Sequence, residues 1–166
     1  MVRVYIPATL AMLQQLVADR ALHARSGTAF AVTPALRESY AEGDDEELAE
    51  VARREAALAS LRLLGGEGAG ELPPRRAVLE AEADDVTLRP DLDAAVVRLA
   101  GAVAFDDVIA AYVDNAEAES AVLAAVDAVD DADLGDEDAE FVVGDAQDHD
   151  LAWYAPQELA FLLELL

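Results

Sequence analysis

The chain contains no cysteine, no lysine and few aromatic residues. The absence of cysteine excludes disulfides, zinc sites built on thiolates and cysteine nucleophiles. Because aromatic residues make up only 5% of the chain, the core must be built mainly from Ala, Val and Leu. No apolar run is long enough to span a bilayer, and the first residues lack the basic and apolar regions of a secretory signal. We therefore expect a protein that stays in the cytoplasm.

The charge is strongly one-sided, with 35 acidic residues against 11 arginines and a formal net charge of −24. Such a surface repels nucleic-acid phosphate and anionic lipid. We therefore expect no binding to nucleic acid and no attachment to membranes. The same charge would attract a basic protein partner. A mimic of nucleic-acid charge is a further reading, which requires the acidic side chains to form one continuous stripe.

The order of expected elements indicates an α+β fold. Runs rich in β-branched and aromatic residues predict strands, and apolar residues at helical spacing predict helices. The expected strands lie at 2–6, 28–32, 76–83, 95–100, 108–113 and 151–154. The expected helices lie at 7–20, 34–40, 45–64, 115–129 and 156–166. This order predicts a mixed sheet of about five to six strands with helices packed on it, and a ferredoxin-like arrangement fits best among several.

Turn and cap residues predict where several elements end. Pro7 should end the first strand and occupy the first turn of a helix, where its missing N–H costs nothing. Thr33 and Pro34 repeat this pattern as N-cap and first helical residue. Asp44, with Glu47 three residues later, resembles a capping box for the longest helix.

The length of 166 residues suits a single domain covering 1–166. Its one clear interruption is rich in glycine and proline, which predicts a flexible loop at about 65–74.

Two apolar features near the C-terminus predict burial. Trp153 is the only tryptophan and alternates within a short apolar run, so we expect it in the core. The last helix, at 156–166, is apolar on nearly all sides. Such a helix is expected to bury its faces within the fold or across the two-fold interface of a homodimer.

Several segments of the chain are distinctive, namely 4–10, 28–37, 40–44, 97–101, 133–140 and 151–155. Together they resemble a family of uncharacterised small acidic proteins from high-GC actinobacteria. The resemblance spans nearly the whole chain and implies an actinobacterial, intracellular protein. It carries no known activity, so no functional residue follows from it.

The densest run of acidic residues lies at 130–140. Clustered carboxylates can hold Ca²⁺ or Mg²⁺. An EF-hand loop does not fit, because placing Gly135 sixth puts Ala132, Leu134 and Phe141 at positions that need oxygen ligands. We therefore predict a solvated acidic segment, with weak cation binding as the alternative, and no dedicated metal or cofactor site.

No catalytic signature is present, and two functions from different classes remain. The first is a non-enzymatic interaction or accessory protein, which the acidic surface and the apolar last helix favour. The alternative is a small-molecule-binding protein or enzyme with a site near His149, Trp153 and Tyr154, since His149 lies between two aspartates and close to two aromatic residues. A deep pocket lined by those three residues would favour the alternative.

Overall fold

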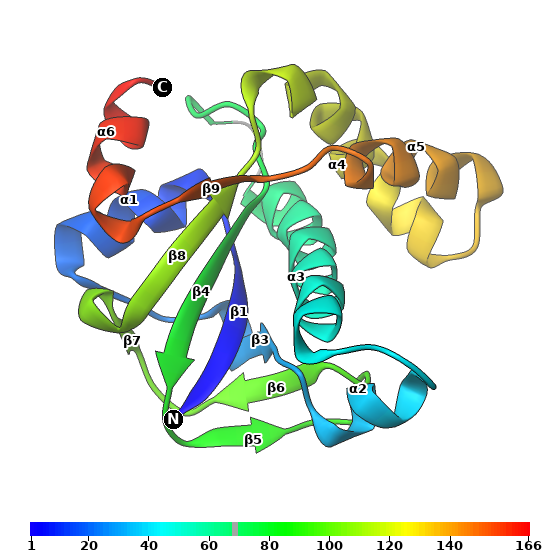
Figure 1. The fold of residues 1–166 in the computed structure, drawn as a ribbon. Coiled ribbons are helices and arrows are strands. Elements are labelled where there is room, and N and C mark those ends of the chain that lie inside the picture. The colour runs from blue at the N-terminus through cyan, green and yellow to red at the C-terminus, as the bar shows by residue number, and fades with distance from the viewer. Residues whose placement is uncertain (68–69) are drawn as a thin grey trace.

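The computed structural model describes residues 1–67 and 70–166 and has an α+β fold (Figure 1). Its main sheet has seven strands in the order β5-β6-β3-β1-β4-β8-β9, and a second sheet pairs β2 with β7. Every strand pair in the described residues is antiparallel. The α+β class is therefore confirmed, but the expectation of a mixed sheet is wrong. Seven strands with helices on both faces also differ from the βαββαβ unit of a ferredoxin-like domain.

The longest strands lie at the centre of the main sheet. The strands are β1 (Val2–Ala8), β2 (Ala21–Leu22), β3 (Thr28–Phe30), β4 (Ala77–Ala83), β5 (Val86–Leu88), β6 (Val96–Leu99), β7 (Val103–Ala104), β8 (Val108–Val113) and β9 (Ala152–Tyr154). The helices are α1 (Leu10–Asp19), α2 (Pro34–Ser39), α3 (Asp45–Glu67), α4 (Glu119–Asp133), α5 (Glu137–Gln147) and α6 (Leu159–Glu164). The sequence pattern does not predict β2, β5 and β7, which have only two or three residues each.

Strand β1 continues through Pro7, where the sequence predicted its end. Pro7 pairs with Val78 of β4, and the strand ends at Ala8. On its other side β1 pairs with β3 only at Tyr5. A proline is tolerated there because no neighbouring strand needs its N–H. The N-cap of α1 is Thr9, whose hydroxyl accepts a hydrogen bond from the N–H of Met12.

Side chains alternate between the two faces of the main sheet, as the pleat of a strand requires. Ile6 and Leu79 point to the face covered by α1 and α6, and Tyr5 and Val78 point to the face covered by α3. We call these the α1 face and the α3 face. Helices α4 and α5 pack on α3 through a separate apolar cluster, and they lie beyond α3 in Figure 1. The sheet is therefore buried on both faces, and α3 separates it from the α4–α5 pair.

Helix α3 is fixed at its start and near its end. The N–H of Glu47 donates to the Asp44 carboxylate at 2.9 Å, as the capping pattern predicts. Near the other end the buried Ser60 hydroxyl donates to the Ala8 carbonyl at 2.7 Å and accepts the Ala77 N–H at 3.1 Å. The helix ends at Glu67, so it includes the first residues of the loop predicted at 65–74. Two residues of that loop, 68 and 69, lie outside the described residues.

The C-terminal segment is less buried than the sequence predicts. Trp153 is 58% exposed, so its expected place in the core is wrong. Its strand, β9, is the last of the sheet, and apolar alternation does not reveal whether a neighbouring element covers the strand. In α6, Leu159 and Leu162 are buried, but Phe161 and the C-cap residue Leu165 are exposed. The helix thus buries one face within the fold and leaves the other open.

The acidic run at 130–140 forms the end of α4 and the start of α5. Asp136 is the N-cap of α5, and its carboxylate accepts the N–H of Ala139 at 2.9 Å. Asp133 forms an ion pair with Arg62 of α3 through two hydrogen bonds. Two of these acids therefore have structural roles.

Among the described helices, none is both long and apolar enough to cross a membrane.

Candidate functional site

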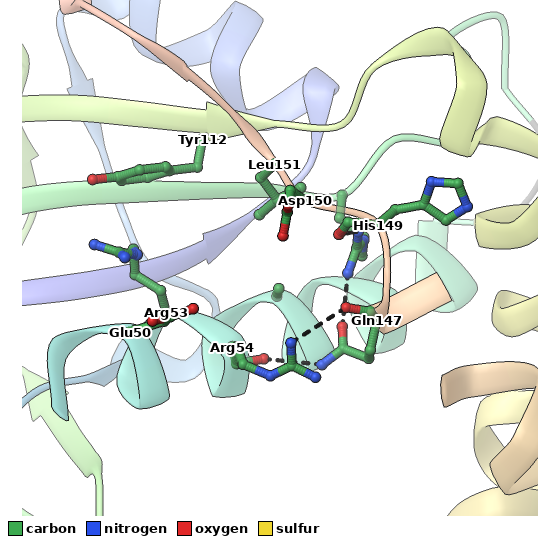
Figure 2. A pocket seen from close by; sticks show the side chains of 10 residues that line it. Glu50, Arg53, Arg54, Tyr112, Gln147, His149, Asp150 and Leu151 are labelled. Atoms are coloured by element: carbon green, nitrogen blue, oxygen red, sulfur yellow. Dashed lines mark hydrogen bonds between the residues drawn. The ribbon is translucent and has the colours of Figure 1, made fainter. Parts of the chain in front are cut away.

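A polar cleft lies on the α3 face, between α3 and the strands β4, β8 and β9. One part is a cavity of about 190 Å³ between α3 and the segment that leads into β9 (Figure 2). A second hollow, of about 680 Å³, lies between α3 and the strands β1 and β4. Both are lined by Arg53 and Tyr112, so they meet at these two residues. We call the two parts together the α3 cleft.

The α3 wall of the cavity is one stripe along the helix. Its residues recur at spacings of three, four and seven, which places them on one side of an α-helix; they are Glu50, Arg53, Arg54 and Ala57. The opposite wall comes from Tyr112 of β8 and from Asp150 and Leu151, which precede β9. Segments far apart in the sequence therefore build the site.

A buried ion pair supports the inner end of the cavity. The side chains of Arg76 and Asp114 are 2% and 0% exposed, and two hydrogen bonds of 2.9 and 2.8 Å join them. The Arg76 guanidinium also donates to the Gln147 side-chain oxygen and to the His149 carbonyl, each at 2.8 Å. Because its donors are used within the protein, Arg76 holds the cavity wall in place and leaves ligand binding to other residues.

Gln147 connects this wall to α3. Its side-chain amide donates to the Arg54 carbonyl at 3.2 Å, and the Arg54 guanidinium donates to the Gln147 carbonyl at 3.4 Å (Figure 2). The end of α5 is thereby tied to the middle of α3.

A buried carboxylate lies beneath the larger hollow. The Tyr112 hydroxyl donates to Glu80 at 2.8 Å, and the Arg3 guanidinium lies 3.4 Å from the other Glu80 oxygen. Burial and this hydrogen bond to Glu80 raise the pKa of Tyr112 to about 12. Burial, together with the charge of Glu80, also raises the pKa of Tyr5. Both tyrosines are therefore neutral hydrogen-bonding groups at neutral pH.

Arg53 occupies the junction of the two hollows. Its guanidinium carbon lies 5.0 Å from the centre of the Tyr112 ring and 6.0 Å from that of Tyr5. Figure 2 shows the guanidinium directed toward Tyr112. Within residues 1–67 and 70–166, no carboxylate forms an ion pair with Arg53. Cation–π contacts hold the side chain without neutralising its charge.

Comparison with protein families gives a match over residues 2–163. The chain belongs to DUF6912, a family of unknown function. No curated protein and no solved structure matches the chain. The DUF6912 match includes every residue of the α3 cleft except Met1. Because the family has no known function, the geometry of the cleft is what indicates a function for this DUF6912 protein.

The structure does not bring His149, Trp153 and Tyr154 onto one surface. His149 reaches the cavity, but its ring points away from Tyr112 and Arg53 (Figure 2). Trp153 is on the α3 face, as its cross-strand partner Tyr112 is. Tyr154 packs against the apolar cluster of the α1 face. In this DUF6912 protein only His149 lines the cavity, and Trp153 lies beside it.

Sequence reasoning missed Arg53, Tyr112 and Glu80. One signal was available for Glu80, a charged residue within the apolar strand 76–83. Such a residue in a buried strand needs a polar partner. No comparable signal marks Arg53, because an arginine on an amphipathic helix is common. For the acidic segment of this DUF6912 protein, the described residues contain no group of three potential ligands placed to hold a metal.

Proposed function

We propose that the α3 cleft binds a small molecule through an anionic group, a carboxylate or a phosphate, held by Arg53. The observation that carries this proposal is the position of Arg53, which lines both hollows and has no carboxylate partner in the described residues. A guanidinium presents planar N–H donors that match carboxylate and phosphate oxygens.

Arg53 is one of four arginines that form no ion pair among the described residues. Acidic residues outnumber arginines by 35 to 11, and most of the arginines form ion pairs, such as Arg37 with Asp45 and Arg75 with Glu119. Arg53 lies instead against two tyrosine rings in a partly buried position. Because the net negative charge disfavours anions in general, binding one requires a local positive group, and Arg53 supplies it.

The remaining residues of the cleft can serve the rest of a ligand. The anionic group can occupy the junction of the two hollows at Arg53, and the rest of the ligand can extend from there. Arg54 adds a second positive charge at the rim, whereas Glu50 and Asp150 can accept hydrogen bonds from N–H or O–H groups. The cleft shows no nucleophile paired with a base, so the proposal is binding without catalysis.

Isothermal titration calorimetry with acetate and with inorganic phosphate, at low ionic strength, tests this proposal. Arg53→Gln should weaken binding about tenfold or more, because a hydrogen-bonded charge is lost. Arg25→Gln is the matched control, since Arg25 is exposed and lies outside the cleft. Equal affinities for the wild type and for Arg53→Gln, or no saturable binding of either anion, would contradict the proposal.

A second candidate function is the docking of a basic protein partner, in a non-enzymatic accessory role. The observation that favours it is that residues 99–166 contain no lysine or arginine. Phe141 on α5 is 73% exposed, and Asp138 and Asp145 lie one helical turn to either side. If the wild type and Phe141→Ala capture a basic protein equally well, docking on α5 loses its support.

The remaining expectations from the sequence stay predictions. They are an actinobacterial and cytoplasmic protein, one domain, no binding to nucleic acid, no attachment to membranes, and a homodimer. If α6 forms the dimer, its exposed residue Phe161 lies in the interface. Phe161→Asp should then convert a dimer to a monomer in light scattering.

A further inference from the structure

We propose that Trp153 is a stacking platform for the ligand, so that the anionic group bound by Arg53 is carried on a planar aromatic ring. This inference rests on the proposed anion site and specifies the rest of the molecule. Aryl carboxylates, aryl phosphates and nucleotides share the required chemistry.

The register of β8 and β9 places Trp153 next to the anion site. Trp153 and Tyr112 are directly opposite each other in the antiparallel pair, so their side chains emerge on the same face of the sheet. Side chains in such a pair are in contact distance, with Cβ atoms about 4.5–5.5 Å apart. Since Arg53 lies over the Tyr112 ring, Arg53 and Trp153 both flank the same tyrosine.

The exposure of Trp153 leaves its indole available to a ligand. Strand β9 is at the end of the sheet, so no further strand covers its outer side, and Trp153 is 58% exposed. A tryptophan that stabilised the core would be covered by neighbouring side chains. The site thus combines an indole open to solvent with an arginine that has no ion pair. These two groups together suit a flat, negatively charged molecule.

A ligand in this arrangement spans two groups with separate roles. The ring of the ligand stacks on Trp153, and its anionic group extends across Tyr112 to Arg53. Stacking on an aromatic side chain should strengthen binding by about tenfold or more relative to a non-aromatic ligand with the same charge.

The test compares phenyl phosphate with ethyl phosphate, which carry the same charged group on an aromatic or an aliphatic carrier. Trp153 is the only tryptophan, so its fluorescence reports on this site alone. Phenyl phosphate should quench the fluorescence and bind about tenfold more tightly than ethyl phosphate. In calorimetry, Trp153→Leu should bind the two compounds equally, and Trp153→Phe should keep part of the preference.

Each failure has a distinct result. Equal affinity of the wild type for both compounds, or a preference that survives in Trp153→Leu, would overturn the stacking role while Arg53-dependent binding stands. Loss of binding of both compounds in the wild type would overturn the anion site itself. Because Trp153 is largely exposed, Trp153→Leu should melt close to the wild-type temperature, and this melt confirms that the comparison is made on folded protein.

Discussion

Replacing Arg76 with methionine tests the most buried ion pair among the described residues. The methionine keeps much of the apolar stem but leaves the Asp114 carboxylate, which is 0% exposed, without its counter-ion. The change removes both hydrogen bonds of the ion pair and the two bonds to Gln147 and His149. Removing one partner of a buried ion pair typically costs about 3–5 kcal/mol, a large fraction of the ~5–15 kcal/mol that stabilises a domain.

Urea denaturation followed by circular dichroism measures this loss. A second variant, Arg76→Met with Asp114→Asn, should regain part of the stability, because the asparagine carries no charge and still offers an oxygen to the N–H of residue 76. Arg89→Gln, which breaks an exposed ion pair with Asp91, is the control and should leave the unfolding free energy unchanged within error. If Arg76→Met lies within about 1 kcal/mol of the wild type, the ion pair does not have the structural role assigned to it.

Three further predictions concern other contacts of the fold. Ser60→Ala should cost about 1–3 kcal/mol in urea denaturation, because it leaves the Ala8 carbonyl and the Ala77 N–H unsatisfied; a smaller loss would mean that water replaces the hydroxyl. The pKa of Tyr112 is about 12 in the folded protein against 10.0 for a free tyrosine. The stabilisation that comes from this raised pKa is therefore complete below pH 10 and is lost as the pH rises through 12. Absorbance of tyrosinate should show this late titration, and Glu80→Gln should move it to lower pH; no movement would refute the hydrogen bond. Gly27→Ala should be destabilising, because φ is +69° and a Cβ would lie 2.8 Å from the Leu99 carbonyl oxygen, whereas Gly144→Ala in the open face of α5 should stabilise by about 0.5–1 kcal/mol in the same melts.

Local signals in the sequence predicted those parts of the fold that depend on neighbouring residues. The start of α3 follows from the Asp44 side chain and the start of α2 from Thr33 and Pro34, because each cap needs only the next three residues. Strand β4 follows from its alternation, and β8 from its β-branched and aromatic residues. Each of these signals depends on residues close together in the sequence, and so do the interactions that it predicts.

The order of strands and the candidate site depend on contacts that have no local signal. Arg53 lies over the Tyr112 ring because α3 packs on the sheet along β1, β3 and β4, and nothing in either segment encodes that packing. Trp153 is a second example. Its alternating apolar pattern predicts burial, but β9 is at the edge of the sheet and the side chain is exposed. The candidate site of His149, Trp153 and Tyr154 was based on their closeness in the sequence, but the His149 ring and Tyr154 point to other surfaces.

The most direct test of the anion site is the NMR signal of the Arg53 Nε–Hε group during titration with phenyl phosphate. Arg53→Lys identifies this signal by its disappearance from the spectrum. We expect the Arg53 signal to shift with a saturable dependence on ligand, while the signals of the ion-paired Arg62 and Arg89 stay in place. An Arg53 signal that does not move, or that moves no more than those of Arg62 and Arg89, would contradict the assignment of the α3 cleft as a binding site for anions.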